Sequence, residues 1–154
     1  MKRSAWLLAV MVVAGSVVAL AQPEITPIKD VTTVPKGYGF GPRLHPLLKI
    51  RKMHEGVDFK VPTGTPVRAT ASGVVIEADS KKGFGVTVRI RHQHGYVTCY
   101  AHLDHSVVKK GMKVTEGSVI AYSGNSGLSA GPHLHYEVIK NGKHVDPKDY
   151  FASN

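Results

Sequence analysis

The chain has 154 residues, a formal net charge of +9 and a single cysteine. This is the length of one ordinary domain, long enough to bury a core of its own, and one cysteine excludes an internal disulfide. The positive charge favours anionic polymers of the cell envelope as partners, whereas no basic segment interleaved with aromatic residues indicates nucleic acid.

Residues 1–21 are typical of a signal peptide. Lys2 and Arg3 precede an uncharged, mostly apolar stretch, and Ala19-Leu20-Ala21 offers a small-x-small cleavage site. The apolar stretch is short for a membrane span of about 20 residues. The sequence therefore predicts a secreted or periplasmic protein without a stable membrane span after cleavage.

Residues 22–36 contain three of the nine prolines and show no helical periodicity. This composition predicts an extended N-terminal arm. The remaining residues, 37–154, are expected to form the working domain.

The first of three polar clusters contains His54 and Asp58. Gly56 is a poor helix former, and the residues from Val57 to Val61 alternate between apolar and polar, so we expect both side chains on extended backbone. In that geometry Glu55 points the other way and has no role in catalysis.

The second and third clusters lie on predicted strands. His102 stands at the end of an alternating run, 96–103, and His133 and His135 are two residues apart. Positions i and i+2 of a strand share a face, so the last pair points into one cavity. A catalytic zinc site takes three protein ligands and keeps one position open. The first cluster and one histidine of the last supply three ligands, and two histidines remain for proton transfer.

The chain after residue 36 has the pattern of an all-β domain, a compact antiparallel sheet or sandwich with the site in a groove on the sheet. Asn141-Gly142 is a strong signal for a two-residue hairpin turn. Short β-branched or aromatic runs between turn-forming clusters predict strands at 67–70, 73–77, 86–92, 96–103, 118–122 and 133–140.

Alternation in the 96–103 run places Cys99 and Ala101 on the face opposite Tyr100 and His102. Cys99 is therefore expected to be a small buried hydrophobe. The glycine-rich segment 124–131 lacks the lysine of a phosphate loop, so it is interpreted as turns, or as a loop beside the cleft.

The other histidines are expected to lie outside the site. His92 and His94 abut a probable turn and are expected to be solvated, and His105 and His144 lie in polar turns. The role of His45 stays open between folding the loop that leads to the site and lining the cleft.

Two segments, 64–75 and 108–120, resemble biotinyl and lipoyl carrier domains in their pattern of short strands. A carrier needs a modifiable lysine on a tight turn and has no use for the histidine clusters. It also works in the cytoplasm, which the export signal contradicts.

Six short motifs follow one another in the chain: Arg43-x-His45-Pro46, His54-x-Gly-x-Asp58, Gly64-Thr-Pro-Val, Tyr100-Ala-His102-Leu, Gly131-Pro-His133-Leu-His135 and Val145-Asp-Pro147. In this order they resemble the lysostaphin-type, LytM-like zinc endopeptidases that act on peptidoglycan. The resemblance covers most of 37–151, and Val86 and Tyr136 depart from residues common in that family.

The resemblance implies that His54, Asp58 and His135 bind Zn²⁺. It assigns His102 and His133 to catalysis, as general base and transition-state stabiliser in an order left open. The implied reaction is hydrolysis of amide bonds in the peptide cross-links of peptidoglycan. The alternative is a catalytically silent relative that binds peptidoglycan or activates another enzyme; such relatives typically lack one or more of these five residues, all of which are present here.

Overall fold

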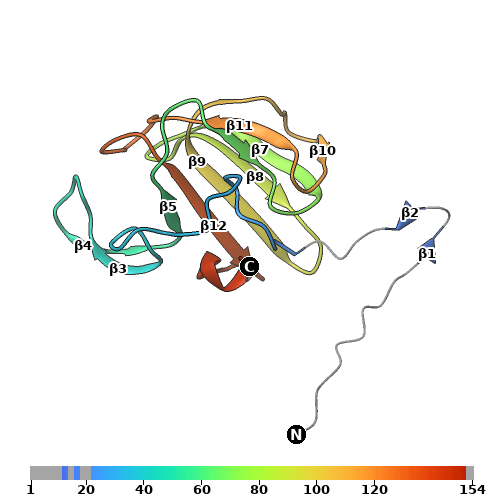
Figure 1. Cartoon of the computed structure of the whole chain (residues 1–154), viewed down its shortest axis with the longest axis horizontal. Coiled ribbons are helices and arrows are strands. Elements are labelled where there is room, and N and C mark those ends of the chain that lie inside the picture. The colour runs from blue at the N-terminus through green and yellow to red at the C-terminus, as the bar shows by residue number, and fades with distance from the viewer. Residues whose placement is uncertain (1–11, 14–15, 18–21, 152–154) are drawn as a thin grey trace, which may run out of the picture.

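Nine antiparallel strands form the main sheet of the protein, and a two-stranded hairpin projects beside it (Figure 1). The computed structural model describes residues 12–13, 16–17 and 22–151, so most of the predicted signal segment lies outside the described residues. The all-β prediction is confirmed. The main sheet contains β5 (Val57–Phe59), β6 (Pro66–Arg68), β7 (Gly73–Lys81), β8 (Gly85–Arg91), β9 (Tyr96–Ser106), β10 (Lys113–Val114), β11 (Val119–Ser123), β12 (Leu134–Lys140) and β13 (Lys143–Val145).

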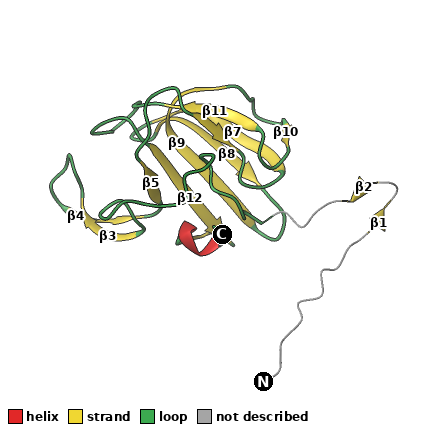
Figure 2. Ribbon diagram, viewed as in Figure 1, coloured by secondary structure: helices red, strands yellow, loops and turns green. Residues whose placement is uncertain are grey.

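The remaining elements are short. β1 (Val12–Val13) pairs with β2 (Ser16–Val17), and β3 (Gly41–Leu44) pairs with β4 (Arg51–His54). A single 3₁₀ turn, η1 (Pro147–Tyr150), follows β13, and strands and loops make up the rest of the described chain (Figure 2). Within this described part, no helix is long and apolar enough to cross a membrane.

The central strand β9 holds the sheet together because it pairs with β8, β11 and β12. The first half of β9 lies against β12, and its last residues lie against β11. Each of the six predicted strand segments overlaps one of β6, β7, β8, β9, β11 and β12, whereas β10 was not predicted.

The turn between β12 and β13 is the predicted two-residue hairpin. Asn141 and Gly142 have φ angles of 49° and 79°, as a type I′ turn requires at both central positions. This turn fixes the register, with Lys140 opposite Lys143 and Val138 opposite Val145. The prediction from the Asn-Gly pair is confirmed.

The predicted arm, 22–36, packs along the domain. Ile28 is only 3% exposed and joins the core, and the amide of Arg68 on β6 donates a hydrogen bond to the Pro27 carbonyl at 2.9 Å. No residue between 22 and 36 lines the cleft described below. In this structure the segment covers the core and leaves the cleft open.

Two tyrosine hydroxyl groups meet a threonine inside the core. Tyr100 and Tyr136 are fully buried and lie opposite each other on β9 and β12. The Thr70 amide donates to the Tyr100 hydroxyl at 3.0 Å, and the Thr70 hydroxyl lies 2.8 Å from the Tyr136 hydroxyl. Thr98 also donates to Tyr100, at 3.0 Å. Buried polar groups in such a network are costly to leave without partners.

Tyr100→Phe is expected to lower the free energy of unfolding by about 1–3 kcal/mol, because it removes the hydroxyl acceptor of the buried Thr70 amide. Tyr136→Phe is expected to cost about 1 kcal/mol or less, because Thr70 keeps its hydrogen bonds to Tyr100. Urea denaturation of the two variants measures the difference. Equal losses in both variants would contradict this account of the network.

Candidate metal centre

Three strands bring His54, Asp58 and His135 together. His54 ends β4, Asp58 is the central residue of β5, and His135 lies near the start of β12. Asp58 stands directly opposite His135 in the register of β5 and β12, so their side chains share a face. Extended backbone was predicted for His54 and Asp58. The structure agrees, but it places them on two strands with Glu55 and Gly56 between them.

Gly56 lets the chain pass close over β12. A Cβ atom at this position would overlap the carbonyl oxygen of Tyr136 and would lie 3.0 Å from Glu137 Cγ and from His135 Cε1. Any side chain at Gly56 would therefore push β5 away from β12 and separate Asp58 from His135.

The three side chains direct one donor atom each to a common point. His135 Nδ1 lies 2.9 Å from Asp58 Oδ1, His54 Nε2 lies 3.2 Å from the same oxygen, and the two nitrogens are 3.2 Å apart. Tetrahedral zinc with ligands at about 2.1 Å separates its donor atoms by about 3.4 Å. All three residues are buried. The spacing of the donor atoms thus fits a metal ion.

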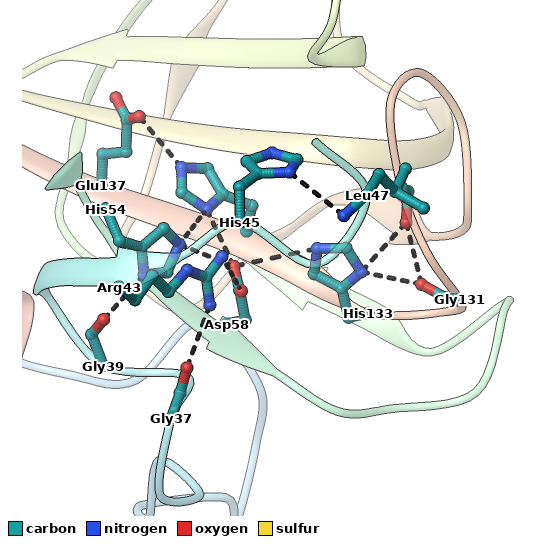
Figure 3. A network of polar contacts seen from close by, with 12 residues as sticks. Gly37, Gly39, Arg43, His45, Leu47, His54, Asp58, Gly131, His133 and Glu137 are labelled. Carbon is teal, nitrogen blue, oxygen red and sulfur yellow. Dashed lines mark hydrogen bonds and ion pairs between the residues drawn. The ribbon is translucent and has the colours of Figure 1, made fainter. Parts of the chain in front are cut away.

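Each of the three residues also contacts a further group through an atom that does not face the common point (Figure 3). His54 Nδ1 donates to the Gly39 carbonyl at 2.7 Å, and His135 Nε2 donates to Glu137 Oε1 at 2.9 Å. Arg43 forms an ion pair with the second oxygen of Asp58 at 2.9 Å. Because the outer nitrogens carry the protons in the neutral rings, the inner ones present lone pairs to a metal ion.

Opposite charges in the cluster shift two of its pKa values. Burial alone would raise the pKa of Asp58, but hydrogen bonds from His135 and His54 outweigh it and hold this pKa well below the ordinary value. Burial alone would lower the pKa of His135, yet Asp58 and Glu137 raise it to about 9. Without a metal ion, His135 therefore carries a second proton at neutral pH.

His102 reaches the same cavity through a bulge in β9. The register between β8 and β9 shifts between Val86 and Val88, and His102 has a φ angle of 56°. The predicted alternation, which placed Tyr100 and His102 on one face, is therefore wrong: Tyr100 is in the core, whereas His102 lines the cleft. Bulges near functional sites turn a side chain in this way.

His102 and His133 face each other beside the three donor atoms, with ring centroids 4.8 Å apart. His102 Nδ1 donates to the Ser126 carbonyl at 2.8 Å, and burial lowers the pKa of this ring to about 4. His133 Nδ1 donates to the Gly131 carbonyl at 2.8 Å, and its Nε2 lies 3.8 Å from Asp58 Oδ1. In the neutral state each ring therefore has an Nε2 lone pair.

The site lies in a cleft of about 510 Å³. The β3–β4 hairpin contributes Arg43, His45 and Lys52 to its lining, and the predicted glycine-rich loop contributes residues 128–131. His45 has both of the roles left open from the sequence, because its Nδ1 also accepts hydrogen bonds from the Leu47 and Leu48 amides at 3.3 and 3.1 Å.

Two of the remaining histidines differ from expectation. His92 was predicted to be solvated, but it is 7% exposed, and its ring nitrogens form hydrogen bonds with the Ser72 carbonyl and the Thr98 hydroxyl. His144 was expected in a polar turn but lies on β13; it stays away from the three donor atoms, as expected, and lies 3.1 Å from Glu137, the partner of His135. His94 and His105 are exposed, and Cys99 is buried as predicted.

Sequence reasoning missed the partners that stand behind the predicted ligands. Glu137 lies two residues after His135, so strand alternation alone places both on one face and could have identified it. Arg43 is far from Asp58 in the sequence, and the contact depends on how the β3–β4 hairpin folds over β5. The Gly39 and Ser126 carbonyls leave no signal in side-chain patterns.

The chain is similar over most of its own length to two bacterial proteins. It is 47% identical over 108 residues to the DD-carboxypeptidase/endopeptidase Mpg of Neisseria meningitidis, covering 70% of this chain and 25% of that protein. It is 46% identical over 104 residues to the peptidoglycan DD-endopeptidase ShyA of Vibrio cholerae, covering 68% and 24%. The chain thus spans about a quarter of the length of these relatives.

Solved structures agree with the sequence comparison. A zinc-containing peptidase from Vibrio cholerae superposes with a TM-score of 0.74 at 36% identity, covering 83% of this chain and 40% of that one. The catalytic domain of lysostaphin from Staphylococcus simulans gives 0.69 at 36% identity, covering 76% and 91%. The model of peptidase family M23 matches residues 52–147. The chain therefore belongs to peptidase family M23, as its resemblance to the lysostaphin-type enzymes implied.

Proposed function

We propose that this chain is a zinc-dependent endopeptidase that hydrolyses amide bonds in the peptide cross-links of peptidoglycan. The observation that carries the proposal is the convergence of two imidazole lone pairs and a carboxylate oxygen, within 3.2 Å of one another, beside two further histidines in a cleft. The names of the M23 relatives, which include peptidoglycan DD-endopeptidases, supply the substrate class.

His54 Nε2, Asp58 Oδ1 and His135 Nδ1 would hold the zinc ion. When bound, zinc supplies a Lewis acid that polarises the scissile carbonyl group and lowers the pKa of water. Glu137, Arg43 and the Gly39 carbonyl keep the three ligands in orientation.

His102 acts as the general base in this proposal. Its lowered pKa, about 4, keeps the ring unprotonated at neutral pH, and its Nδ1 is tied to the Ser126 carbonyl. The free Nε2 can therefore accept a proton from the attacking water. The bulge in β9 fixes the ring in this position.

His133 acts as the proton or hydrogen-bond donor in this proposal. The Gly131 carbonyl accepts from its Nδ1, and Ser129 lies 3.1 Å from the same nitrogen, so the ring is held by the loop. In its protonated form, Nε2 can donate to the tetrahedral oxyanion or to the leaving amine. The two histidines thus handle separate protons.

We propose export as the location of this activity. The substrate of such an enzyme lies outside the cytoplasm, and the N-terminal features of a signal peptide agree with that location. Without Lys2 and Arg3 of the signal segment, 18 basic residues face 11 acidic ones, and this formal net charge of +7 would attract the protein to anionic polymers of the envelope.

Digestion of purified sacculi tests the proposed function. The chain is stripped of metal with a chelator, and half of it is reloaded with one equivalent of Zn²⁺. The reloaded protein is expected to release cross-link fragments, identified by mass spectrometry, and the stripped protein is expected to release none. Wall binding without fragments in the reloaded sample would favour a catalytically silent relative.

Zinc binding is expected to release about one proton per site at pH 7.5, because His135 has a pKa of about 9 and must lose its Nδ1 proton to bind the metal. For the same reason, zinc affinity should rise about tenfold per pH unit between pH 7 and pH 8 and level off above pH 9. Titration calorimetry in buffers of different ionisation enthalpy measures the protons released. Zero release at pH 7.5 would contradict the protonated state of His135.

A further inference from the structure

His135 is connected to two polar side chains, Glu137 and His144, that are not among the five proposed zinc-binding and catalytic residues. Its Nε2 donates to Glu137 Oε1 at 2.9 Å, and the other oxygen, Oε2, accepts from His144 Nε2 at 3.1 Å. Glu137 is 4% exposed, and the His144 side chain is 31% exposed. The series therefore runs from a buried ring through a buried carboxylate to a half-buried ring.

The β12–β13 hairpin builds this series. His135 and Glu137 are two residues apart on β12 and share the face opposite the core residue Tyr136. The two-residue turn at 141–142 sets the register that places His144 diagonally across from Glu137 on the same face. Both contacts thus follow from strand geometry.

Both oxygens of Glu137 are used by ring nitrogens, which holds the carboxylate in one orientation. A carboxylate so held accepts a hydrogen bond from only one nitrogen of His135, Nε2. The neutral tautomer with its hydrogen on Nε2 is then favoured, and Nδ1 is left to face Asp58 at 2.9 Å. The orientation of the ring and the identity of its free nitrogen are set together.

We propose that Glu137 and His144 are positioning residues for metal binding by His135, an inference that rests on the proposed zinc site. Glu137 selects the tautomer that binds through Nδ1, and His144 holds Glu137 in place. Neither residue touches the metal ion or the substrate.

A second ion held by Glu55, Glu137 and His144 is the competing explanation, because these three groups also lie within reach of one another. The contacts favour positioning. Both Glu137 oxygens already accept hydrogen bonds, and Glu55 lies 3.7 Å from His144 with a side chain that is 50% exposed.

Zinc dissociation constants and stoichiometry, measured by competition with a chromogenic chelator at constant pH, test the proposal. Glu137→Gln keeps the size of the side chain and is expected to weaken zinc binding about 10–100-fold. His144→Ala acts one hydrogen bond further out, and a loss of about three- to tenfold is expected. Glu55→Gln and His105→Ala are the matched controls and should bind zinc as the wild type does.

Thermal melting of the metal-free variants shows that each is folded. Replacing zinc by Co²⁺ adds a second readout, because the visible absorption band should change in Glu137→Gln and stay unchanged in Glu55→Gln. A merely structural role would lower the melting temperature without altering the spectrum of the loaded protein.

Wild-type affinity in folded Glu137→Gln and His144→Ala would overturn the positioning role while leaving the proposed function intact. A wild type that binds two zinc ions, one of which is lost in both Glu55→Gln and His144→Ala, would overturn it in favour of the second ion. A wild type that binds no zinc would remove the proposed function and this inference with it.

Discussion

His135→Ala is expected to abolish both zinc binding and the release of cross-link fragments from sacculi. The substitution removes one of three donor atoms and deprives Asp58 Oδ1 of its contact with His135 Nδ1 at 2.9 Å. Outer partners of metal ligands are already worth about 10–100-fold in affinity, so loss of a ligand should exceed a hundredfold. Zinc content by atomic absorption and fragment release measured on the same sample check both effects.

His105→Ala is the matched control for this variant. His105 is an exposed histidine that pairs with Asp104 and stacks on Tyr122, outside the cleft. It should keep full zinc content and full fragment release. If His135→Ala released the same fragments at the same rate, His135 would have no part in the mechanism.

His102→Asn is expected to lower the rate of fragment release by about 10²–10⁴, the usual contribution of a general base, while zinc still binds at one equivalent. Asparagine tolerates the φ angle of 56° at this bulge better than alanine, so the fold is preserved. Single-turnover kinetics on a defined cross-linked peptide measures the chemical step.

A control with the same backbone strain is available. His94 also has a φ angle of 56° but lies in an exposed turn, so His94→Asn should react at the wild-type rate. A rate for His102→Asn within threefold of His94→Asn would show that another group takes the proton. Loss of zinc from His102→Asn would instead place the residue among the ligands.

The strands were predictable because local patterns determine them. Short β-branched or aromatic runs between turn-forming clusters identified β7, β8, β9 and β12, and the Asn141-Gly142 pair identified the turn into β13. In each case the signal lies within about ten consecutive residues. The all-β fold follows from such signals and needs no knowledge of distant contacts.

The face of His102 was not predictable from alternation, because it depends on a bulge. The pairing of β9 with β8 on one side and with β12 on the other places Tyr100 in the core. The extra residue of β9 in the bulge after Tyr100 then turns His102 toward the cleft. A strand considered alone carries no sign of this. The resemblance to the lysostaphin-type family assigned His102 to the catalytic site. The local alternation, by contrast, placed its side chain on the same face as Tyr100, which is a core residue.

For His92 the sequence-based prediction of solvent exposure was wrong. Its position beside a turn and its polar neighbours indicated solvent exposure, but the ring is buried and bridges the Ser72 carbonyl and Thr98. Burial lowers the pKa of His92, so it remains neutral in the core network. Its partner Ser72 is 20 residues away in the sequence, and only tertiary contact makes a polar ring acceptable there.

Of the residues that contact the proposed metal ligands, one was predictable from the local pattern and one was not. Glu137 follows from alternation, because it lies on the same strand as His135. Arg43 depends on the β3–β4 hairpin, which pairs only with itself and reaches Asp58 through its side chain. Sequence patterns thus specify groups on one strand better than groups that meet across separate sheets.

A diffraction measurement at the zinc absorption edge, on crystals of the zinc-loaded chain, tests the central claim most directly. The account predicts one strong anomalous peak about 2.0–2.2 Å from His54 Nε2, Asp58 Oδ1 and His135 Nδ1. A peak bound through His133 in place of His135, or no peak within reach of Asp58 at saturating zinc, would contradict it.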